Sequence, residues 1–569
     1  MKNFKRIIAV LLAVIVVASL AACGGSKGGD TNASGAADDK GGSSAQGLNF
    51  TIIYGNNEGD EVAKVAQAIQ EMIEENLPGV TIQLSPMTKA ERLDKMQEDN
   101  YEIALTRWGP DYADPMTYLG MWITNNSNNY GFWSNPDYDA IIADCTTGEL
   151  AGQYDKRWDA LHEAEALVMN EAVIAPLYTK ANANLIAEGL KGVEFHPVAL
   201  NRVYKRATST DGTADVMFAT NVMSLDTNLA TDGDSFEVIA DCIDGLTQMD
   251  ADGKAIPALA ESWEVAEDGK TYTFHLKDAK WSNGDPVTAN DFVFAWRRIA
   301  QLAGEYAYML SDIGQVVGAA EIIAGEADPS TLGVTAIDDK TLEVKLNAPV
   351  SYFESLMYFP TFYPINENFY NGLAEGTYAT SPETFLSNGA FVLTDYTPGT
   401  ASMSLVKNAD YYDAANVTLD AINYQVVGSS DNALTAFKNG TLDLVTVNGD
   451  QVASVQADPE LSKLLNVTGA GYMWYLTFSQ TENNAGGLLA NQNLRLAISN
   501  AIDRVSLAEN YVMDGSIPTY TAVPPQFAAS STTGEDFSAD QNMFADVIGF
   551  DTERAQAFLE VAKSELGIK

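Results

Sequence analysis

Few side chains of this chain have the types and spacing that catalysis requires. Its three histidines, His162, His196 and His275, lie far apart and lack metal-ligand spacing. The chain has no glycine-rich phosphate loop, no nucleophile elbow and no zinc motif. A glycosidase pair could hide among the many acids, as in any acidic protein. The sequence therefore predicts a protein that is not an enzyme and uses no cofactor or metal.

The charge balance excludes one class of partner. The 569 residues include 77 acidic and 33 basic side chains, for a net charge of −44. Such a chain offers no basic surface to neutralise phosphates, so we expect no nucleic-acid binding. We interpret the acidity as a feature that keeps the protein soluble outside the cell. The alternative is that the negative charge attracts cationic ligands. The length predicts two or three domains.

The first 22 residues have the pattern of a secretory signal, with a basic start and an apolar run at 7–20. The run ends in Leu20-Ala21-Ala22-Cys23, which resembles the bacterial lipoprotein lipobox. That resemblance implies lipid attachment at Cys23 and a location on the extracytoplasmic face of the cell membrane. The alternative is an ordinary signal with a chance cysteine. Residues 23–47 are rich in Gly and Ser and predict a flexible tether. We expect no disulfide between Cys145 and Cys242.

The order of elements predicts an α/β protein. Strand patterns at 48–54, 80–84 and 103–105 enclose a helical pattern at 62–75. Residues 206–213 are small and polar and read as a linker. Residues 494–502 predict a helix with Arg495 on its polar side.

A run of motifs in the second part of the chain carries a resemblance. It comprises Ala258-Leu259-Ala260-Glu261-Ser262-Trp263, Thr271-Tyr272-Thr273-Phe274-His275-Leu276, Lys280-Trp281-Ser282-Asn283-Gly284-Asp285-Pro286-Val287-Thr288-Ala289, Asn388-Gly389-Ala390-Phe391, Gly440-Thr441-Leu442-Asp443 and Ala501-Ile502-Asp503-Arg504. In this order the motifs resemble the extracellular solute-binding proteins that include the oligopeptide- and dipeptide-binding proteins of ABC importers. The resemblance covers nearly all of the chain after the tether.

The order of two blocks departs from that family. The segment 51–204, with Trp108-Gly109-Pro110-Asp111-Tyr112-Ala113-Asp114-Pro115, resembles the family's last part but comes first here. The segment 217–246 resembles its beginning. The blocks 48–205 and 214–569 neither overlap nor leave a gap, so we predict a circular permutation with 206–213 joining the usual termini. A rearranged gene whose product folds poorly or swaps lobes between two chains is the alternative.

The resemblance implies a two-lobed periplasmic-binding-protein-like fold with an extra subdomain and a hinge between the lobes. The peptide-binding lobe is expected from 48–177 and 480–569. The main lobe is expected from 178–205, 214–262 and 375–479, with 263–374 as the inserted subdomain. The chain would cross between lobes near 475–479 and 177–180.

The resemblance also implies a ligand site. Asp111 matches the family's amine-binding carboxylate, and Asp114 beside it fits a cap or turn. The backbone of Arg107, Trp108 and Gly109 would pair with an extended ligand, and Thr231, Asp232 and Gly233 match the opposite edge. The remaining candidates for ligand contact are aromatic residues, and for each the alternative is ordinary core packing. They are Trp108, Tyr112, Tyr306, Tyr308, Trp474 and Tyr475.

The site departs from the family where a peptide carboxylate would bind. Leu105 and Asp60 stand where family members have basic residues, and Thr477 nearby is neutral. Arg107 or Lys89 would be the substitutes, or the ligand would be longer or amidated. The hypothesis is that no side chain here holds a free carboxylate.

The resemblance therefore predicts a monomeric, lipid-anchored component that captures oligopeptides and delivers them to an ABC permease and its ATPase. The alternatives are a binder of another solute, such as an oligosaccharide or metal complex, and a peptide-pheromone sensor.

Overall fold

The computed structural model describes residues 48–198, 200–250, 254–530 and 532–568. The predicted signal, the tether and Cys23 lie outside the described residues. Among the helices of the described part, none is long and apolar enough to cross a membrane.

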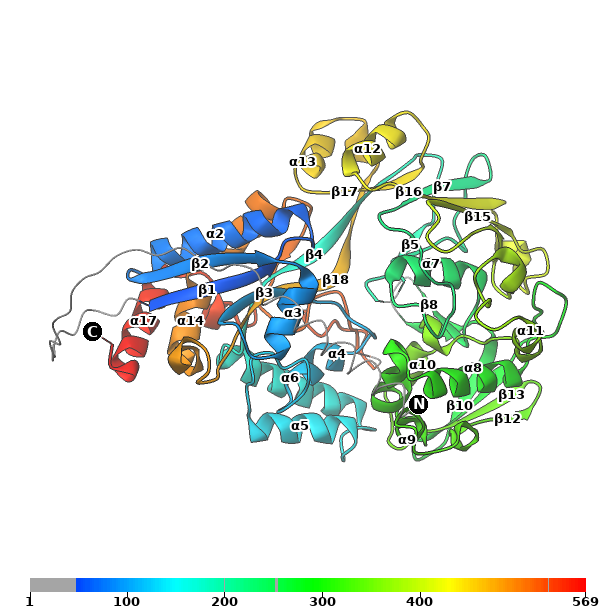
Figure 1. Ribbon diagram of the computed structural model, residues 1–569, viewed down its shortest axis with the longest axis horizontal. Helices are drawn as coiled ribbons and strands as arrows, with labels where there is room; N and C mark the ends of the chain where they lie inside the picture. The colour runs from blue at the N-terminus through cyan, green and yellow to red at the C-terminus, as the bar shows by residue number, and fades with distance from the viewer. Residues whose placement is uncertain (1–47, 199, 251–253, 531, 569) are drawn as a thin grey trace, which may run out of the picture. The chain divides into compact units, whose positions relative to one another are not determined.

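An 11-stranded sheet is built around two long antiparallel neighbours, β4 (Ile174–Ile186) and β18 (Leu465–Phe478). We call these the crossing strands (Figure 1). Beyond β18 lie, in order, β3 (Ile103–Trp108), β1 (Leu48–Gly55) and β2 (Val80–Met87). Beyond β4 lie β17 (Leu444–Val447), β7 (Thr213–Phe218), β16 (Ala421–Val426), β15 (Ser402–Lys407) and β14 (Phe391–Asp395), while β19 (Ile517–Pro518) also pairs with β4.

Residues from both ends of the described chain form the core of the first lobe, residues 48–177 and 480–569. Helix α2 (Asp60–Asn76) buries Val62, Val65, Ile69 and Ile73, whose spacing puts them on one helix face. The late helices α14 (Gln492–Asn500) and α17 (Thr552–Leu566) pack into the same core as β1 and α2 (Figure 1). This lobe therefore needs both blocks of the chain to fold.

Smaller helices complete the first lobe. Asn135 caps α5, which begins at a proline, and Thr88 forms a capping box with Glu91 on α3. The helices are α3 (Lys89–Gln97), α4 (Met116–Leu119), η1 (Gly120–Trp122), α5 (Pro136–Thr146), α6 (Tyr154–Asn170), η9 (Ala485–Ala490), α15 (Arg504–Ser506), η10 (Leu507–Val512) and α16 (Ala545–Ile548).

In the predicted main lobe, from 178–205, 214–262 and 375–479, early and late segments also meet. Arg202 donates a buried hydrogen bond of 3.0 Å to Glu237 on α7 (Gly233–Cys242). The other elements are β5 (Glu194–Phe195), β6 (Arg202–Val203), β8 (Thr247–Met249), β9 (Ala255–Pro257), η6 (Pro382–Thr384), η7 (Ala414–Asn416), α12 (Ser430–Lys438), α13 (Asp450–Ala457) and η8 (Leu461–Lys463).

A separate four-stranded sheet begins at Ala260, three residues before the predicted start of the inserted subdomain at 263–374. Its antiparallel order is β10 (Ala260–Val265), β11 (Thr271–Leu276), β13 (Thr341–Lys345) and β12 (Val334–Asp338). Helix α8 (Ala289–Leu302) covers it with the fully buried Phe292 and Trp296. The short helices are η2 (Glu305–Ala307), η3 (Met309–Ile313), α9 (Ala319–Ile323), η4 (Pro329–Thr331), α10 (Phe353–Leu356), η5 (Pro360–Phe362) and α11 (Glu367–Gly372).

The prediction that Arg495 lies on a polar helix face is wrong. Its side chain is 2% exposed and donates to the carbonyl oxygens of Glu171, Ala172, Leu489 and Ala490. The turn after α6 covers this face of α14, a contact between distant segments that helical spacing cannot reveal. Cys145 and Cys242 are both buried free thiols.

Candidate functional site

The end of β3 offers backbone to an extended ligand. On one side β18 pairs with β3 as far as Trp108. On the other side the pairing with β1 ends at Leu105. The backbone from Thr106 to Trp108 therefore has a side without a strand partner in the described chain, next to the turn that carries Asp111. An edge of this kind can accept a ligand main chain by strand addition.

The turn after β3 is held from several directions. The Asp111 N–H donates to Thr117 Oγ1 at 3.1 Å, and Trp108 Nε1 donates to the Thr117 carbonyl at 3.0 Å. A side chain at position 109 would collide with the Tyr472 ring, so Gly109 allows that ring to pack on the backbone. Asp114 accepts the Met116 N–H and both guanidinium nitrogens of Arg157, at 2.9 and 2.7 Å. Asp114 is thus a structural turn residue.

The environment of the Asp111 carboxyl favours binding of a cation. Burial raises its pKa to about 6; the Tyr308 hydroxyl counters this by hydrogen bonding, and Glu305 adds to it through its charge. The ion pairs formed among the described residues do not include Asp111. A half-buried carboxylate without a cation is stabilised by an incoming ammonium group, which replaces the solvation that burial removes.

Tyr306 is influenced by charges from both predicted edges, those of Asp111 and Asp232. Burial raises the pKa of Tyr306, and Asp111, Glu305, Tyr472 and Asp232 all raise it further by their charges. Asp232 also caps α7, accepting the Ser235 N–H at 2.8 Å. Thr231 is exposed and Gly233 half-buried in the same turn. Tyr306 itself is partly buried, with its ring 5.5 Å from Phe236.

Three of the candidate aromatic residues lie in packed interior. Trp474 and Tyr475 are 1% and 2% exposed within β18, and Tyr112 is 4% exposed. Trp474 and Tyr475 therefore pack in the core of this structure, which was the alternative to a ligand contact. Trp108 remains partly exposed beside the free side of β3.

The guanidinium of Arg107, on the strand edge itself, already contacts other side chains. The Arg107 guanidinium lies 4.9 Å from the centre of the Tyr472 ring and 5.6 Å from that of Trp474, and its Nε is 3.6 Å from Glu58 Oε1. Leu105 is fully buried, Thr477 is 3% exposed, and Lys89 is exposed at the start of α3. These positions supply no unpaired cation at the strand edge for a carboxylate.

Two tyrosines near the site were not singled out from the sequence. Tyr472 lies over Gly109 and is 38% exposed, and Gly471 before it takes a positive φ of 71° within an irregular stretch of β18. Tyr352 stacks on Tyr112 from the inserted subdomain. For Tyr472, the glycine before it is a weak signal in the sequence. For Tyr352, the sequence offers no signal.

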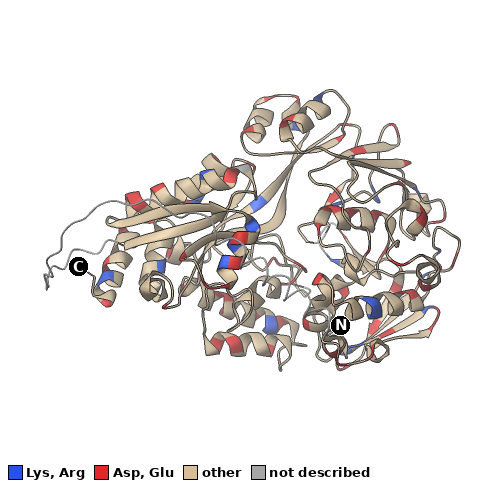
Figure 2. Ribbon diagram, in the orientation of Figure 1, with Lys and Arg blue, Asp and Glu red and all other residues tan. Residues whose placement is uncertain are grey.

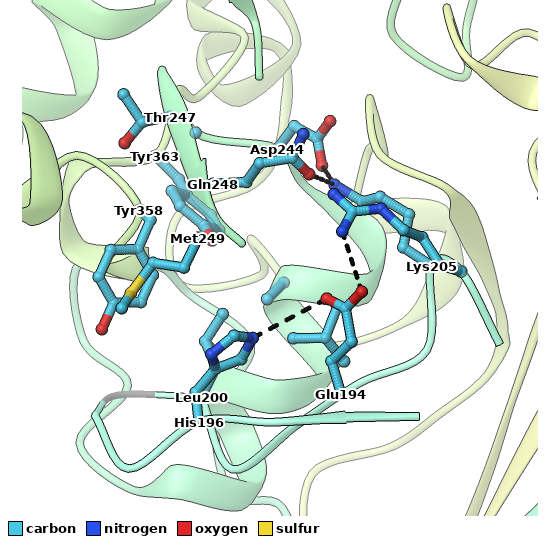
Figure 3. A pocket seen from close by; sticks show the side chains of 14 residues that line it. Glu194, His196, Leu200, Lys205, Asp244, Thr247, Gln248, Met249, Tyr358 and Tyr363 are labelled. Carbon is cyan, nitrogen blue, oxygen red and sulfur yellow. Dashed lines mark hydrogen bonds and ion pairs between the residues drawn. The ribbon is translucent and has the colours of Figure 1, made fainter. Parts of the chain in front are cut away.

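A small pocket elsewhere lies where the two blocks of the chain meet (Figure 3). Lys205 pairs with Asp244 at 2.5 Å, and Glu194 lies 3.9 Å from His196. The cavity measures about 40 Å³, far below the size of ligand pockets. Because the charged residues of this pocket pair with one another, we interpret the pocket as a packing contact between the two blocks. Among the described residues, no cluster of His, Cys, Asp or Glu is arranged to hold a metal ion.

A family model matches this chain over residues 21–130 and 254–569, and its description is bacterial extracellular solute-binding proteins, family 5 Middle. The chain belongs to that family. The family is one of solute-binding proteins, and the resemblance found in the sequence motifs is confirmed.

Curated relatives and solved structures agree with this membership. The chain is 32% identical over 63% of its length to a dipeptide-binding protein of Lactococcus lactis, and 32% identical over 64% to the oligopeptide-binding protein OppA of Bacillus subtilis. These matches span 66% and 64% of the relatives' own length, which is less than two thirds. The solved OppA of Listeria monocytogenes bound to peptide has 31% identity and a TM-score of 0.50, with 63% of this chain and 70% of that chain covered.

The pheromone receptor PrgZ, solved to show its mode of peptide binding, has 30% identity and a TM-score of 0.50, with 62% and 68% covered. The predicted α/β, two-lobed binding-protein fold is confirmed by these matches.

Proposed function

We propose that this protein captures oligopeptides between its lobes and delivers them to an ABC permease. The observation that carries the proposal is the Asp111 carboxyl, which has a raised pKa and lies beside a strand edge. Within the described part of the chain, the carboxyl has no ion-pair partner and the edge has no strand partner. An ammonium group next to an extended backbone is what the amino end of a peptide presents. The peptide-binding relatives support the same substrate class. In this role the protein is not an enzyme.

Titration calorimetry with oligoalanines of three to eight residues tests this function. Each peptide is used in free, N-acetylated and C-amidated form. We expect N-acetylation to weaken binding about 100-fold, because it removes the ammonium that Asp111 would meet. We expect C-amidation to change affinity less than about three-fold, because the cations near the edge are already paired or exposed.

Binding of none of the free peptides would contradict the proposal. Mass spectrometry of ligand that co-purifies with the protein then distinguishes an oligosaccharide or a metal complex. A large loss on amidation would show that a side chain does hold the carboxylate. The likeness to a pheromone receptor keeps peptide sensing as a second candidate function. Deletion of the permease separates the two, since transport would stop while sensing would persist.

We further propose that the chain is circularly permuted. Residues 214–569 form about 63% of the chain. The matches to the relatives from Lactococcus and Listeria also cover 63%. The joining segment is tied into the main lobe, because Lys191 and Thr208 exchange backbone hydrogen bonds and Thr418 donates to the Ala207 carbonyl.

Restoring the usual order tests the permutation. The chain is rebuilt as residues 214–569, a short Gly/Ser linker and residues 48–205. We expect a monomer with the same peptide affinity within about three-fold, because the contacts between 48–205 and 214–569 are kept. Only loop closure and the contacts of residues 206–213 change. Light scattering and calorimetry check this. A reordered chain that aggregates while the original order binds peptide would refute the permutation, and a dimer of the original chain would favour lobe swapping.

We also propose that Cys23 carries a lipid that anchors the protein on the extracytoplasmic face of the membrane. The support is the motif Leu20-Ala21-Ala22-Cys23 after an apolar run. Acidic side chains are spread over the helices of both lobes (Figure 2), in keeping with a solvated surface.

A further inference from the structure

An aromatic contact joins the first lobe to the inserted subdomain beside Asp111. Tyr112, the residue after Asp111, stacks on Tyr352 with ring centroids 4.9 Å apart and an angle of 20° between the rings. Tyr352 lies immediately before α10, 240 positions later in the chain. Tyr112 is 4% exposed and Tyr352 is partly buried. Separation of the lobe and the subdomain would expose both rings.

Arg157 forms the other wall of the slot that receives Tyr352. Its guanidinium lies 5.4 Å from the centre of the Tyr352 ring. The same guanidinium holds Asp114 by two hydrogen bonds and donates to the Cys145 carbonyl at 2.9 Å, so it is fixed from within the first lobe. The slot is therefore built by the first lobe, and the ring that fills it comes from the subdomain. Stacking and cation–π attraction both favour the filled slot.

A second tyrosine of the subdomain reaches the same turn. Tyr308 acts on the Asp111 carboxyl and lowers its pKa, against the effect of burial. Tyr352 acts on the ring of the next residue. Both contacts form only when the subdomain meets the first lobe. Ordering of the Asp111 turn is thereby linked to closure of the protein.

We propose that Tyr352 is a positioning residue that couples closure to ligand retention. By seating between Tyr112 and Arg157, it stabilises the closed protein and fixes the turn that carries Asp111. The effect on ligand rests on the proposed function, whereas the effect on closure does not. Loss of the ring would favour opening, and a bound peptide would leave faster while its encounter with the open protein would be unchanged.

The test compares Tyr352→Ala with Tyr352→Phe. The phenylalanine keeps the stack and serves as the matched control. Spin labels on Glu163→Cys in α6 and Ile337→Cys in β12, both exposed positions, report the distance between lobe and subdomain by pulsed resonance. Stopped-flow fluorescence gives association and dissociation rates for the tightest-binding oligoalanine. For Tyr352→Ala we expect longer distances without ligand and about ten-fold faster dissociation, with association within about two-fold.

Tyr352→Phe should match the unmodified protein in both measurements. Distances and dissociation in Tyr352→Ala equal to those of the unmodified protein would overturn the proposal. Faster dissociation without longer distances would overturn it too, since Tyr352 would then act on the ligand directly. If the unmodified protein binds no oligoalanine, the proposed function fails, and the distances still decide the role of Tyr352 in closure.

Discussion

Replacement of Asp111 by asparagine is expected to weaken binding of free oligoalanines about 100-fold. Asparagine keeps the size of the side chain and the backbone N–H that donates to Thr117 Oγ1, so the turn should be preserved. It removes the negative charge that would meet the peptide ammonium, and the loss of one partner of a partly buried charge pair costs about 2–5 kcal/mol. Calorimetry measures the effect.

The matched control is Glu305→Gln, a neighbouring but exposed carboxyl that acts on Asp111 only through its charge. It should change affinity less than about three-fold. N-acetylated peptide should bind equally weakly to Asp111→Asn and to the unmodified protein. Affinity for free peptide within three-fold of the unmodified protein would exclude Asp111 as the ammonium partner.

The same carboxyl makes binding depend on pH. In the free protein the pKa of Asp111 is raised to about 6, mainly by burial. A bound ammonium favours the ionised form and lowers this pKa, so peptide binds best above pH 6. Affinity should fall as pH drops below 6, because the carboxyl must then lose a proton before it can pair. Asp111→Asn should abolish this dependence.

Replacement of Arg504 by methionine is expected to lower the free energy of unfolding by about 4 kcal/mol. Arg504 is fully buried and donates to the carbonyl oxygens of Pro176, Ser499 and Ile502 and to Ser499 Oγ. Burial lowers the pKa of its guanidinium to about 10, with Tyr520 and Asp503 opposing the shift, so the group stays charged at neutral pH. Methionine fills similar space but leaves these carbonyls without donors, each a cost of about 1–3 kcal/mol.

Urea unfolding followed by circular dichroism measures this loss. Arg206→Met is the control, because that arginine is 42% exposed and pairs with Glu194 near the surface. It should cost less than about 1 kcal/mol. Equal unfolding midpoints for the two variants would show that the Arg504 contacts do not hold the two blocks of the first lobe together. The Arg504–Pro176 contact joins residues 328 positions apart, so its loss should affect the whole lobe.

The family and the two-lobed fold were predicted from short motifs that resemble those of the solute-binding proteins, and these motifs are local in the sequence. The string from Ala258 to Ala289 sets strand alternation, a turn and a helix cap within a few residues, and each is read directly from residue types. Asp111 was predicted from the resemblance of residues 108–115 to the family, since by residue type alone it is one of 77 acidic side chains. The burial of Arg495 and of Trp474 depends on segments hundreds of positions away, so helical or strand spacing alone could not predict it.

From the sequence, the resemblance of short motifs to a known family gave the class of protein, which the family match confirms. The permuted order of the two blocks and the role of Asp111 rest on the same resemblance and stay predictions. Composition alone excluded only a nucleic-acid partner. Only the tertiary structure decided three properties of the site. Among the residues that the structure describes, none forms an ion pair with Asp111; Arg107 is already engaged by Tyr472 and Glu58; and Tyr352 of the inserted subdomain stacks on Tyr112, next to Asp111. Those properties arise where distant segments pack together, and there burial sets both the charge of a group and the partners that remain for it.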